Sequence, residues 1–541
     1  MSQIAPYFWL LPTFLYAETH YRFPYFFSFL RKPEPEVIAD LPHRLEPGHT
    51  LPVLVLVKDA HLFPASLRQI RISLRQDDIE IRTLEALKEP LSFSEKLAWH
   101  LISVDTAGIH GWLEIDVEFE LECRGTLRRY HNDNHRTSSH SPLRVYVSND
   151  PLPCYAGLFL GDPHTHSDLT EDQVEFGIPI RPAIALASAM GLSYFCVTDH
   201  SYDLDDSEES YLRNDPSLPK WNHLQHAVDE ANRSSAGFVV IRGEEVSCTN
   251  SIGETVHLLL YGLKKFFHGS GDGAERVGHT QCEHSVVDVL SHREDDVPSF
   301  AAHALEPVPF LQRLILHRGS WHLDDLLEEG LTGLQIINGK LDEGFHEGYR
   351  TWISLLLRGK RAIALAGDDA HGNFNRFRQI GIPFLKIKEH AEQIFGKMRT
   401  AVISKDASLS EQSVVVALGL GRVLLTDGPI VRMDATGIGE TSVPIGGTVR
   451  GTDIVLCLEA LSTSEFGEIN SLRVLVGARG REEEATAYRS DGSQGYVQKK
   501  TLTLSDARMS YVRVEVWTSE AGSCDKQRHF CITNPIWIER G

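Results

Sequence analysis

Two kinds of segment alternate in the middle of the chain, and this alternation restricts the fold more than any other feature. Short apolar runs typical of strands occur at 194–197, 238–241, 257–261, 299–302, 333–337 and 362–366. Stretches with the apolar spacing of helices lie between them, at 183–190, 224–232, 286–292, 322–329 and 347–358. Repeated strand–helix units favour an α/β fold with a parallel sheet, and a segment of about 270 residues suits one barrel.

The segments on either side show a different pattern. Residues 36–150 and 429–541 contain short alternating apolar runs separated by polar, glycine or proline turns, which is typical of β-sandwich-like domains. Residues 1–35 read as an N-terminal arm, because the apolar stretch 4–16 contains Pro6 and Pro12 and is too short for a membrane span. A helix at 411–418, with Ser410 as its N-cap, closes the middle domain, which we place at 151–428.

Composition narrows the functional class. The net charge of -21 argues against bulk binding of nucleic acid, because phosphate is repelled by such a surface. The eight cysteines include no CxxC pair, which favours reduced thiols and a cytoplasmic location. We therefore expect a small-molecule substrate and no membrane, and the oligomeric state stays open.

Side chains of the types that bind metal ions in proteins follow the ends of five predicted strands. They are His164 and His166, Asp199 and His200, Glu244 and Glu245, His303, and Asp368, Asp369 and His371. In a βα barrel the C-terminal strand ends meet on one face. An HxH pair in a strand also projects both imidazoles to one side. Nitrogen and carboxylate ligands without thiolates suit Zn, Mn or Fe, so we predict a hydrolytic metal site.

Competing hydrolase and nucleotide-binding motifs are absent from the sequence. The chain contains no GxSxG elbow, no GxxxxGK[ST] loop and no HExxH helix.

The order of these motifs resembles that of the PHP superfamily, the polymerase and histidinol phosphatase domain. The resemblance extends over about 155–390 and rests on His164-Thr-His166-Ser167, Thr198-Asp199-His200, Gly243-Glu-Glu245, His303 and Asp369-Ala-His371. It implies a distorted seven-stranded (β/α) barrel, a TIM-like barrel in the wider sense, with two or three metal ions. Most members cleave phosphoesters. A barrel between two β-domains also resembles the branch that includes a carbamate hydrolase.

The resemblance further implies a set of ligands. One metal would bind His164, His166, Glu245 and Asp369, and a third would bind Glu245, His257 and His303. The second would bind His200, His371 and an acidic residue after the first motif, either Glu171 or Asp172. Glu244 and Asp368 adjoin two of these ligands, but the motif spacing favours Glu245 and Asp369.

We therefore predict a metal-dependent phosphoesterase that acts on a small phosphorylated metabolite or nucleotide. A carbamate, amide or ester hydrolase and a non-catalytic metal-stabilised binding protein are the alternatives. Asp199 would orient His200, take part in proton transfer, or be structural. Arg376 or Arg378 would clamp a phosphate, or form a surface salt bridge.

Overall fold

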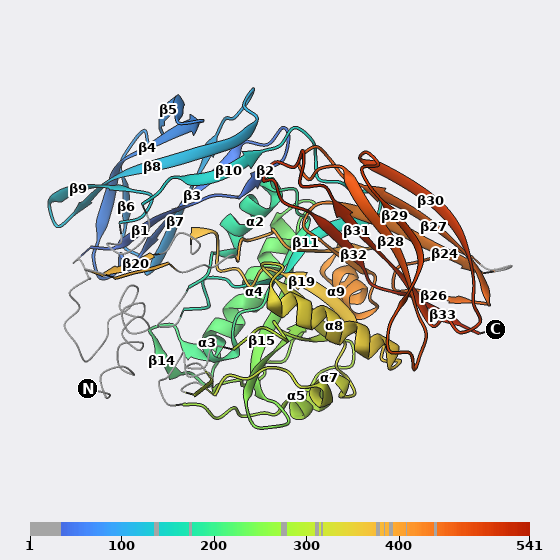
Figure 1. Cartoon of the computed structure of the whole chain (residues 1–541). Helices are drawn as coiled ribbons and strands as arrows, with labels where there is room; N and C mark the ends of the chain where they lie inside the picture. The colour runs from blue at the N-terminus through green and yellow to red at the C-terminus, as the bar shows by residue number, and fades with distance from the viewer. Residues whose placement is uncertain are drawn as a thin grey trace, which may run out of the picture. The chain divides into compact units, whose positions relative to one another are not determined.

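The chain divides into two compact units, each assembled from separate segments of the chain. Figure 1 labels their helices and strands. The computed structural model describes residues 34–134, 140–171, 176–271, 279–308, 313–314, 317–374, 379–382, 385–388, 393–406, 408–437 and 441–540. The first unit comprises Met1–Asn149, Glu171–Met190 and His371–Phe395, and the second comprises Asp150–Thr170, Gly191–Ala370 and Gly396–Gly541.

The first unit is built on two sheets that share one apolar core. The smaller sheet contains β1 (Glu36–Asp40), β3 (Leu51–Lys58) and β7 (Leu97–Val104). The larger contains β2 (Arg44–Leu45), β10 (Leu143–Val147), β8 (Gly111–Cys123), β4 (Ala65–Gln76), β5 (Ile79–Glu85), β6 (Leu91–Phe93) and β9 (Thr126–His131). Alternate residues of β8 are buried, because successive side chains of a strand point to opposite faces.

Two smaller elements complete the described part of the first unit. Helix α2 (Ile180–Ala189) packs against β3. Strands β20 (Gln379–Ile382) and β21 (Leu385–Lys388) form an antiparallel hairpin.

A single large sheet organises the second unit. Its path runs in the order β19 (Ile363–Gly367), β18 (Gly333–Asn338), β17 (Ser299–Ala301), β16 (Thr255–Tyr261), β15 (Val239–Thr249), β12 (Tyr194–Val197), β11 (Leu158–Thr165), β22 (Arg399–Ile403), β23 (Val423–Thr426), β32 (Phe530–Thr533), β31 (Tyr511–Thr518), β28 (Ile469–Gly477) and β29 (Ala485–Asp491). Strands β26 (Thr448–Arg450) and β33 (Ile536–Glu539) pair beside this path.

The prediction of a distorted seven-stranded (β/α) barrel, and of a TIM-like barrel, is wrong. The sheet does not close within the described residues: β11 continues into β22, and an isolated bridge between Thr165 and Ala370 stands where a closing ladder would be needed. Three pairings on the path from β22 to β17 are antiparallel, namely β11 with β22, β15 with β16, and β16 with β17. The turn 250–254 between β15 and β16 is too short for a crossover helix, so these two strands form a hairpin.

Helices flank this sheet at separate places. They are α3 (Ser201–Leu204), α4 (Pro219–Ser234), α5 (Val286–His292), α7 (Leu323–Leu327), α8 (Glu343–Leu357) and α9 (Glu411–Gly419). Ser410 caps α9 as predicted, since its side chain accepts a hydrogen bond from the backbone N–H of Ser413. No helix in the described part of the chain combines the length and apolar character that a membrane span requires.

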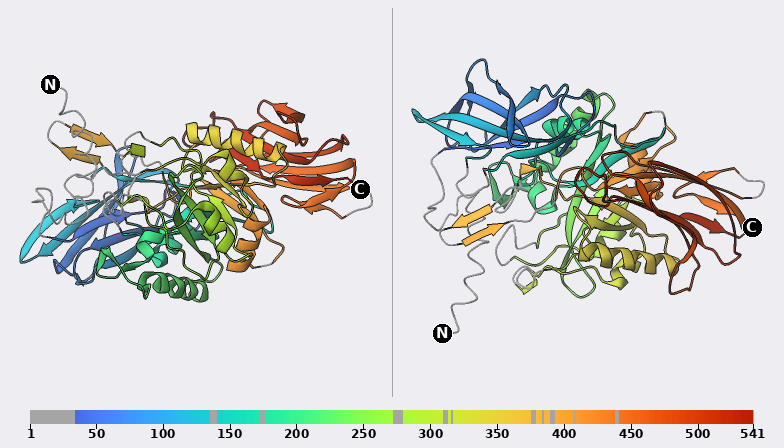
Figure 2. Two further views of the ribbon diagram at one scale, coloured as in Figure 1. Left: turned by 90° about the horizontal axis from the view of Figure 1, so that it is seen from below. Right: turned by 45° about the horizontal axis from the view of Figure 1, so that its top comes forward.

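The C-terminal part of the second unit is rich in strands, as its orange and red ribbons show (Figure 2). A four-stranded sheet here contains β25 (Val443–Pro444), β24 (Ile430–Gly437), β27 (Asp453–Leu461) and β30 (Val497–Ser505). A short hairpin of β13 (Asp206–Ser207) and β14 (Ser210–Asn214) follows α3.

Candidate metal centre

Glu245 on β15 is a fully buried carboxylate surrounded by histidines from four other segments. Its Oε2 lies 3.1 Å from His164 Nε2, 3.2 Å from His166 Nε2 and 3.3 Å from His200 Nδ1. Its Oε1 lies 2.8 Å from His257 Nδ1 and 3.1 Å from His303 Nε2. Each oxygen of the carboxylate therefore faces its own group of imidazoles.

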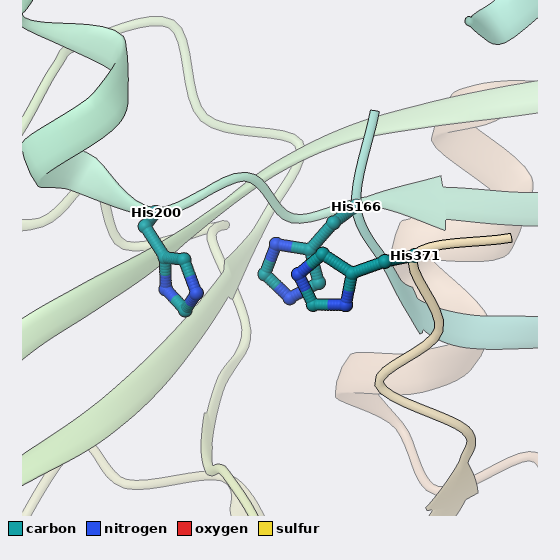
Figure 3. Close-up of side chains that lie close together, drawn as sticks. All are labelled: His166, His200 and His371. Carbon is teal, nitrogen blue, oxygen red and sulfur yellow. The ribbon is translucent and has the colours of Figure 1, made fainter. Parts of the chain in front are cut away.

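The end of β11 supplies two of these histidines. The register of β11 against β12 shifts between Asp162 and Thr165, so His164 lies at an irregularity within the strand. His166 follows directly after β11, and His200 lies between β12 and α3 (Figure 3). The ring of the buried Tyr202 stacks on His200 with centroids 4.7 Å apart, which restricts the orientation of that imidazole.

Two residues of the centre, Asp369 and His303, have an unusual backbone conformation. Asp369 Oδ1 lies 3.3 Å from His164 Nε2 and 3.1 Å from His166 Nε2. The φ angles are +51° at Asp369 and +30° at His303, a region that L-residues other than glycine seldom occupy. Such strain persists only where the surroundings hold it, and it is commonly found at functional sites.

Hydrogen bonds on the far side of two imidazoles fix which nitrogen carries the proton. The carboxylate of Asp199 accepts a hydrogen bond of 2.9 Å from Thr170 Oγ1. Because the Thr170 hydroxyl proton is used there, Thr170 Oγ1 accepts from His166 Nδ1, 3.2 Å away. In the neutral imidazole, His166 Nε2 then carries the lone pair that faces the carboxylates. Asp199, which also accepts from the backbone N–H and hydroxyl of Ser167, thus orients His166.

His164 has an equivalent partner in Gln335 on β18. Gln335 Oε1 lies 2.9 Å from His164 Nδ1, and it also accepts a hydrogen bond from the backbone N–H of His303. The sequence analysis did not identify Gln335. The signal available was a polar amide in the run Gly333-Leu-Gln-Ile-Ile-Asn338, in which all six residues are buried.

These donors suit divalent metal ions. Tetrahedral Zn with bonds of about 2.1 Å holds its ligand atoms about 3.4 Å apart, and the observed N···O separations of 2.8–3.3 Å are close to this value. The ligand atoms of His164, His166, Glu245 and Asp369 all lie within 4.8 Å of one another, as do those of His200, Glu245 and His257. The described residues thus include buried groups that could hold metal ions.

The electrostatic potential of the centre also favours cations. Burial by itself would raise the pKa of Glu245, yet the charges of His164, His257 and His200 hold the pKa of this carboxyl well below its ordinary value. Burial would likewise lower the pKa of His166, but Asp369 and Glu245 hold it well above the ordinary value. The carboxylates therefore attract positive charge to the imidazole nitrogens, where a proton and a metal ion compete.

The neighbouring carboxyl groups lie elsewhere. Glu244 points to the opposite face of β15, where it accepts a hydrogen bond of 2.7 Å from Ser201 Oγ. Burial raises the pKa of Glu244 well above its ordinary value. Asp368 accepts a hydrogen bond from the backbone N–H of Met398, and burial together with Asp162 raises the pKa of its carboxyl. Neither group is directed at the histidines.

The other predicted site residues belong to the first unit or to the part of the chain that the structure does not describe. Glu171 belongs to the first unit, where it pairs with Lys96 Nζ at 2.5 Å and with Lys58 Nζ at 3.9 Å. His371, the third side chain in Figure 3, also belongs to the first unit. Asp172, Arg376 and Arg378 lie outside the described residues.

Comparison with known proteins identifies no family. No protein-family model matches the chain, and no curated protein matches it. A calcium-binding mutant of Bacteroides uniformis beta-glucuronidase 2 is 10% identical, with a TM-score of 0.18 over 93% of this chain, which spans 61% of that structure. A putative beta-galactosidase from Bacteroides fragilis is 9% identical, with a TM-score of 0.18 over 95% of this chain and 74% of that one. These scores are too low to support an inference about fold or activity.

Proposed function

We propose that the chain is a metal-dependent hydrolase with at least two metal ions bridged by Glu245. One observation supports this more than any other: with their Nδ1 protons held by Gln335 and Thr170, neutral His164 and His166 present Nε2 lone pairs 3.1 and 3.2 Å from a carboxylate oxygen that is also an acceptor. Two acceptors at this distance repel unless a cation lies between them. A proton could bridge one such pair of nitrogen and oxygen atoms, whereas the full set of imidazole and carboxylate ligands suits metal ions.

The residues would divide between two positions. His164, His166, Asp369 and Glu245 would hold one ion, and His200, His257 and Glu245 would hold the other, with His303 beside it. When bound, such ions acidify a water molecule and stabilise the negative charge that develops on a substrate oxygen.

The accessible side of the centre indicates how a substrate would approach. The side chains of His164, His166 and Glu245 are fully buried, whereas 24% of the His303 side chain and 15% of the Asp369 side chain are exposed. A substrate oxygen would therefore enter beside His303 and Asp369. The buried Thr170, Gln335 and Tyr202 would keep the histidine ligands oriented during the reaction.

We propose phosphoesters as the substrate class. The support is the order of the five motifs, which resembles that of a superfamily whose members mostly cleave phosphoesters. Metal ions polarise a phosphoryl and a carbonyl oxygen alike, so the ligand set does not itself exclude esters or carbamates.

The test is a metal analysis followed by a substrate screen. Protein purified without chelator is expected to contain at least two metal equivalents. Protein loaded with Mn or Zn is expected to hydrolyse phosphomonoesters or phosphodiesters, and Asp369→Asn is expected to abolish this activity. One equivalent or less would contradict the bridged centre. Hydrolysis of carbamates or carboxylic esters alone would reject phosphoesters, and no hydrolysis by metal-loaded protein would reject the enzyme.

A further inference from the structure

Gln335 contacts two residues that lie on opposite sides of Glu245, and it does so through one amide group. Its Oε1 lies 2.9 Å from His164 Nδ1 and 3.2 Å from the backbone nitrogen of His303. Its Nε2 donates to Ile337 O at 3.2 Å and to Asn338 Oδ1 at 3.0 Å. Since Gln335 is 2% exposed, water does not replace these partners, and each lost contact leaves a buried polar group without a partner.

The orientation of this amide follows from its partners. The N–H of His303 can only donate, so the atom that it contacts is the amide oxygen. That oxygen cannot donate to His164, and His164 Nδ1 must therefore carry a proton and donate. The Nε2 lone pair of His164 is thereby left on the side of Glu245 and Asp369.

The same oxygen also holds the backbone of His303. His303 has a φ of +30°, and a non-glycine residue in this sparsely populated region is strained unless its surroundings hold it there. The bond from His303 N–H to Gln335 Oε1 fixes the backbone at this residue. His303 Nε2 then lies 3.1 Å from Glu245 Oε1, on the other side of the carboxylate from His164.

Asn338 extends the network to a third ligand. Asn338 Oδ1 accepts from Gln335 Nε2, which leaves its amide nitrogen to donate to Asp369 Oδ2 at 3.4 Å. Gln335 and Asn338, both on β18, thus connect His164, His303 and Asp369.

We propose that Gln335 is a positioning residue that couples the two metal positions on either side of Glu245. The inference rests on the proposed function insofar as it requires metal ions at these positions. It goes further, because it assigns one neutral amide to both the imidazole of His164 and the backbone of His303. Loss of Gln335 should therefore weaken both positions together.

The test measures metal binding and needs no substrate. Gln335→Met has nearly the same volume and lacks both polar atoms, whereas Gln335→Asn keeps the amide but is too short to span the same partners. We expect either variant to lower the affinity of both sites for metal by about 10–100-fold. With Co²⁺ as the probe, we also expect an altered visible absorption spectrum. Asn534→Leu is the matched control, because Asn534 is also a buried amide, and among the described residues its side chain bonds only to backbone groups of Ala364 and Val423.

Each outcome has a distinct meaning. If the wild-type chain binds two Co²⁺ ions and Gln335→Met and Gln335→Asn bind them with unchanged affinity and spectrum, the role of Gln335 is refuted while the metal centre stands. Loss of one ion alone would refute the coupling. Equal losses in Asn534→Leu would show a general effect of destabilisation and would also overturn the inference. If the wild type binds no Co²⁺, the proposed function itself fails.

Discussion

Single residues decide the chemistry of the centre, and adjacent residues differ sharply. Glu244 and Glu245 are neighbours on β15 and equally buried, yet they point to opposite faces. The motif spacing favoured Glu245, which lies beside the histidines, over Glu244, which accepts a hydrogen bond from Ser201. Gln335 could not be predicted in this way, because its partner His164 is 171 positions away and their contact depends on how the strands pair.

The difference between the two glutamates is testable. Glu245→Gln removes the charge that bridges the two groups of histidines, so we expect it to lose most of the bound metal. Glu244→Gln should retain the metal, because the pKa of Glu244 is raised by burial and a neutral amide resembles its protonated form. Elemental analysis of the two purified variants is the measurement. Equal metal content would mean that Glu245 is not the bridging ligand.

His529 provides a pH-dependent test outside the centre. It lies 3.0 Å from Asp427 Oδ2 and 3.1 Å from Asp525 Oδ1. Burial would lower the pKa of His529, but Asp427 and Asp525 outweigh it and raise the pKa to about 10. Since the unfolded value is about 6.5, the ion pairs stabilise the fold fully below about pH 6.5, and this contribution is lost as the pH rises towards 10.

The variant His529→Gln should therefore unfold at a clearly lower temperature than wild type at pH 6. The gap between the two melting temperatures should narrow between pH 7 and pH 10. His292→Gln, at an exposed histidine of α5, is the control and should change the melting temperature little at any pH. A gap for His529→Gln that stays constant from pH 6 to pH 10 would contradict the assigned charge.

At the scale of elements, apolar runs in the sequence predicted where the strands lie but not how the strands pair. The run at 362–366 corresponds to β19, and the helix at 411–418 corresponds to α9. The antiparallel hairpin of β15 and β16 was missed although Asn250 and Gly253 lie in the turn between them, a composition typical of hairpins. The direction of a strand depends on the segment that connects it to the preceding strand. Because helical stretches lie between neighbouring strands, we predicted parallel pairing here as well.

Helix α8 is joined to the C-terminal strands by a buried charge cluster. Arg513 on β31 is fully buried, with Nη1 2.6 Å from Glu515 and Nη2 2.6 Å from Glu484. Its guanidinium also lies 5.2 Å from the rings of Tyr349 and Trp352 on α8. Glu484 pairs with Arg513, whereas Glu515 pairs with both Arg513 and Arg473, and a buried charge that loses its partner is costly because water cannot replace that partner.

Replacing Arg513 should consequently be costly. We expect Arg513→Met to lower the free energy of unfolding by about 3–5 kcal/mol, since it removes the buried cation that pairs with Glu484 and leaves Glu515 with Arg473 alone. Arg473 contacts the same Glu515 at 2.6 Å, but 37% of its side chain is exposed, so Arg473→Met should cost less than about 1 kcal/mol. The free energies of unfolding of the two variants are measured by denaturant unfolding followed by tryptophan fluorescence. Similar losses would show that the partially exposed ion pair matters as much as the buried one.

At the scale of the whole molecule, the first unit collects three segments of the chain, and the second unit occupies the intervening ones. Patterns of neighbouring residues do not reveal such an arrangement, because it depends on contacts between distant segments. The metal ligands of the proposed centre all belong to the second unit, even though they come from residues as far apart as His164 and Asp369. Metal binding should therefore act on the stability of this unit.

Removal of metal tests whether the proposed centre stabilises the second unit. A ligand that binds only the folded state stabilises it by about 2.7 kcal/mol at a free concentration of 100 times Kd. Calorimetry is expected to show that chelation lowers the melting temperature of the second unit, that added Zn or Mn restores it, and that the transition of the first unit hardly moves. Glu245→Gln should melt at the same temperature with and without chelator. A chelator-induced shift of equal size in this variant would place the stabilising metal elsewhere, and equal shifts of both transitions would contradict a centre built from the second unit alone.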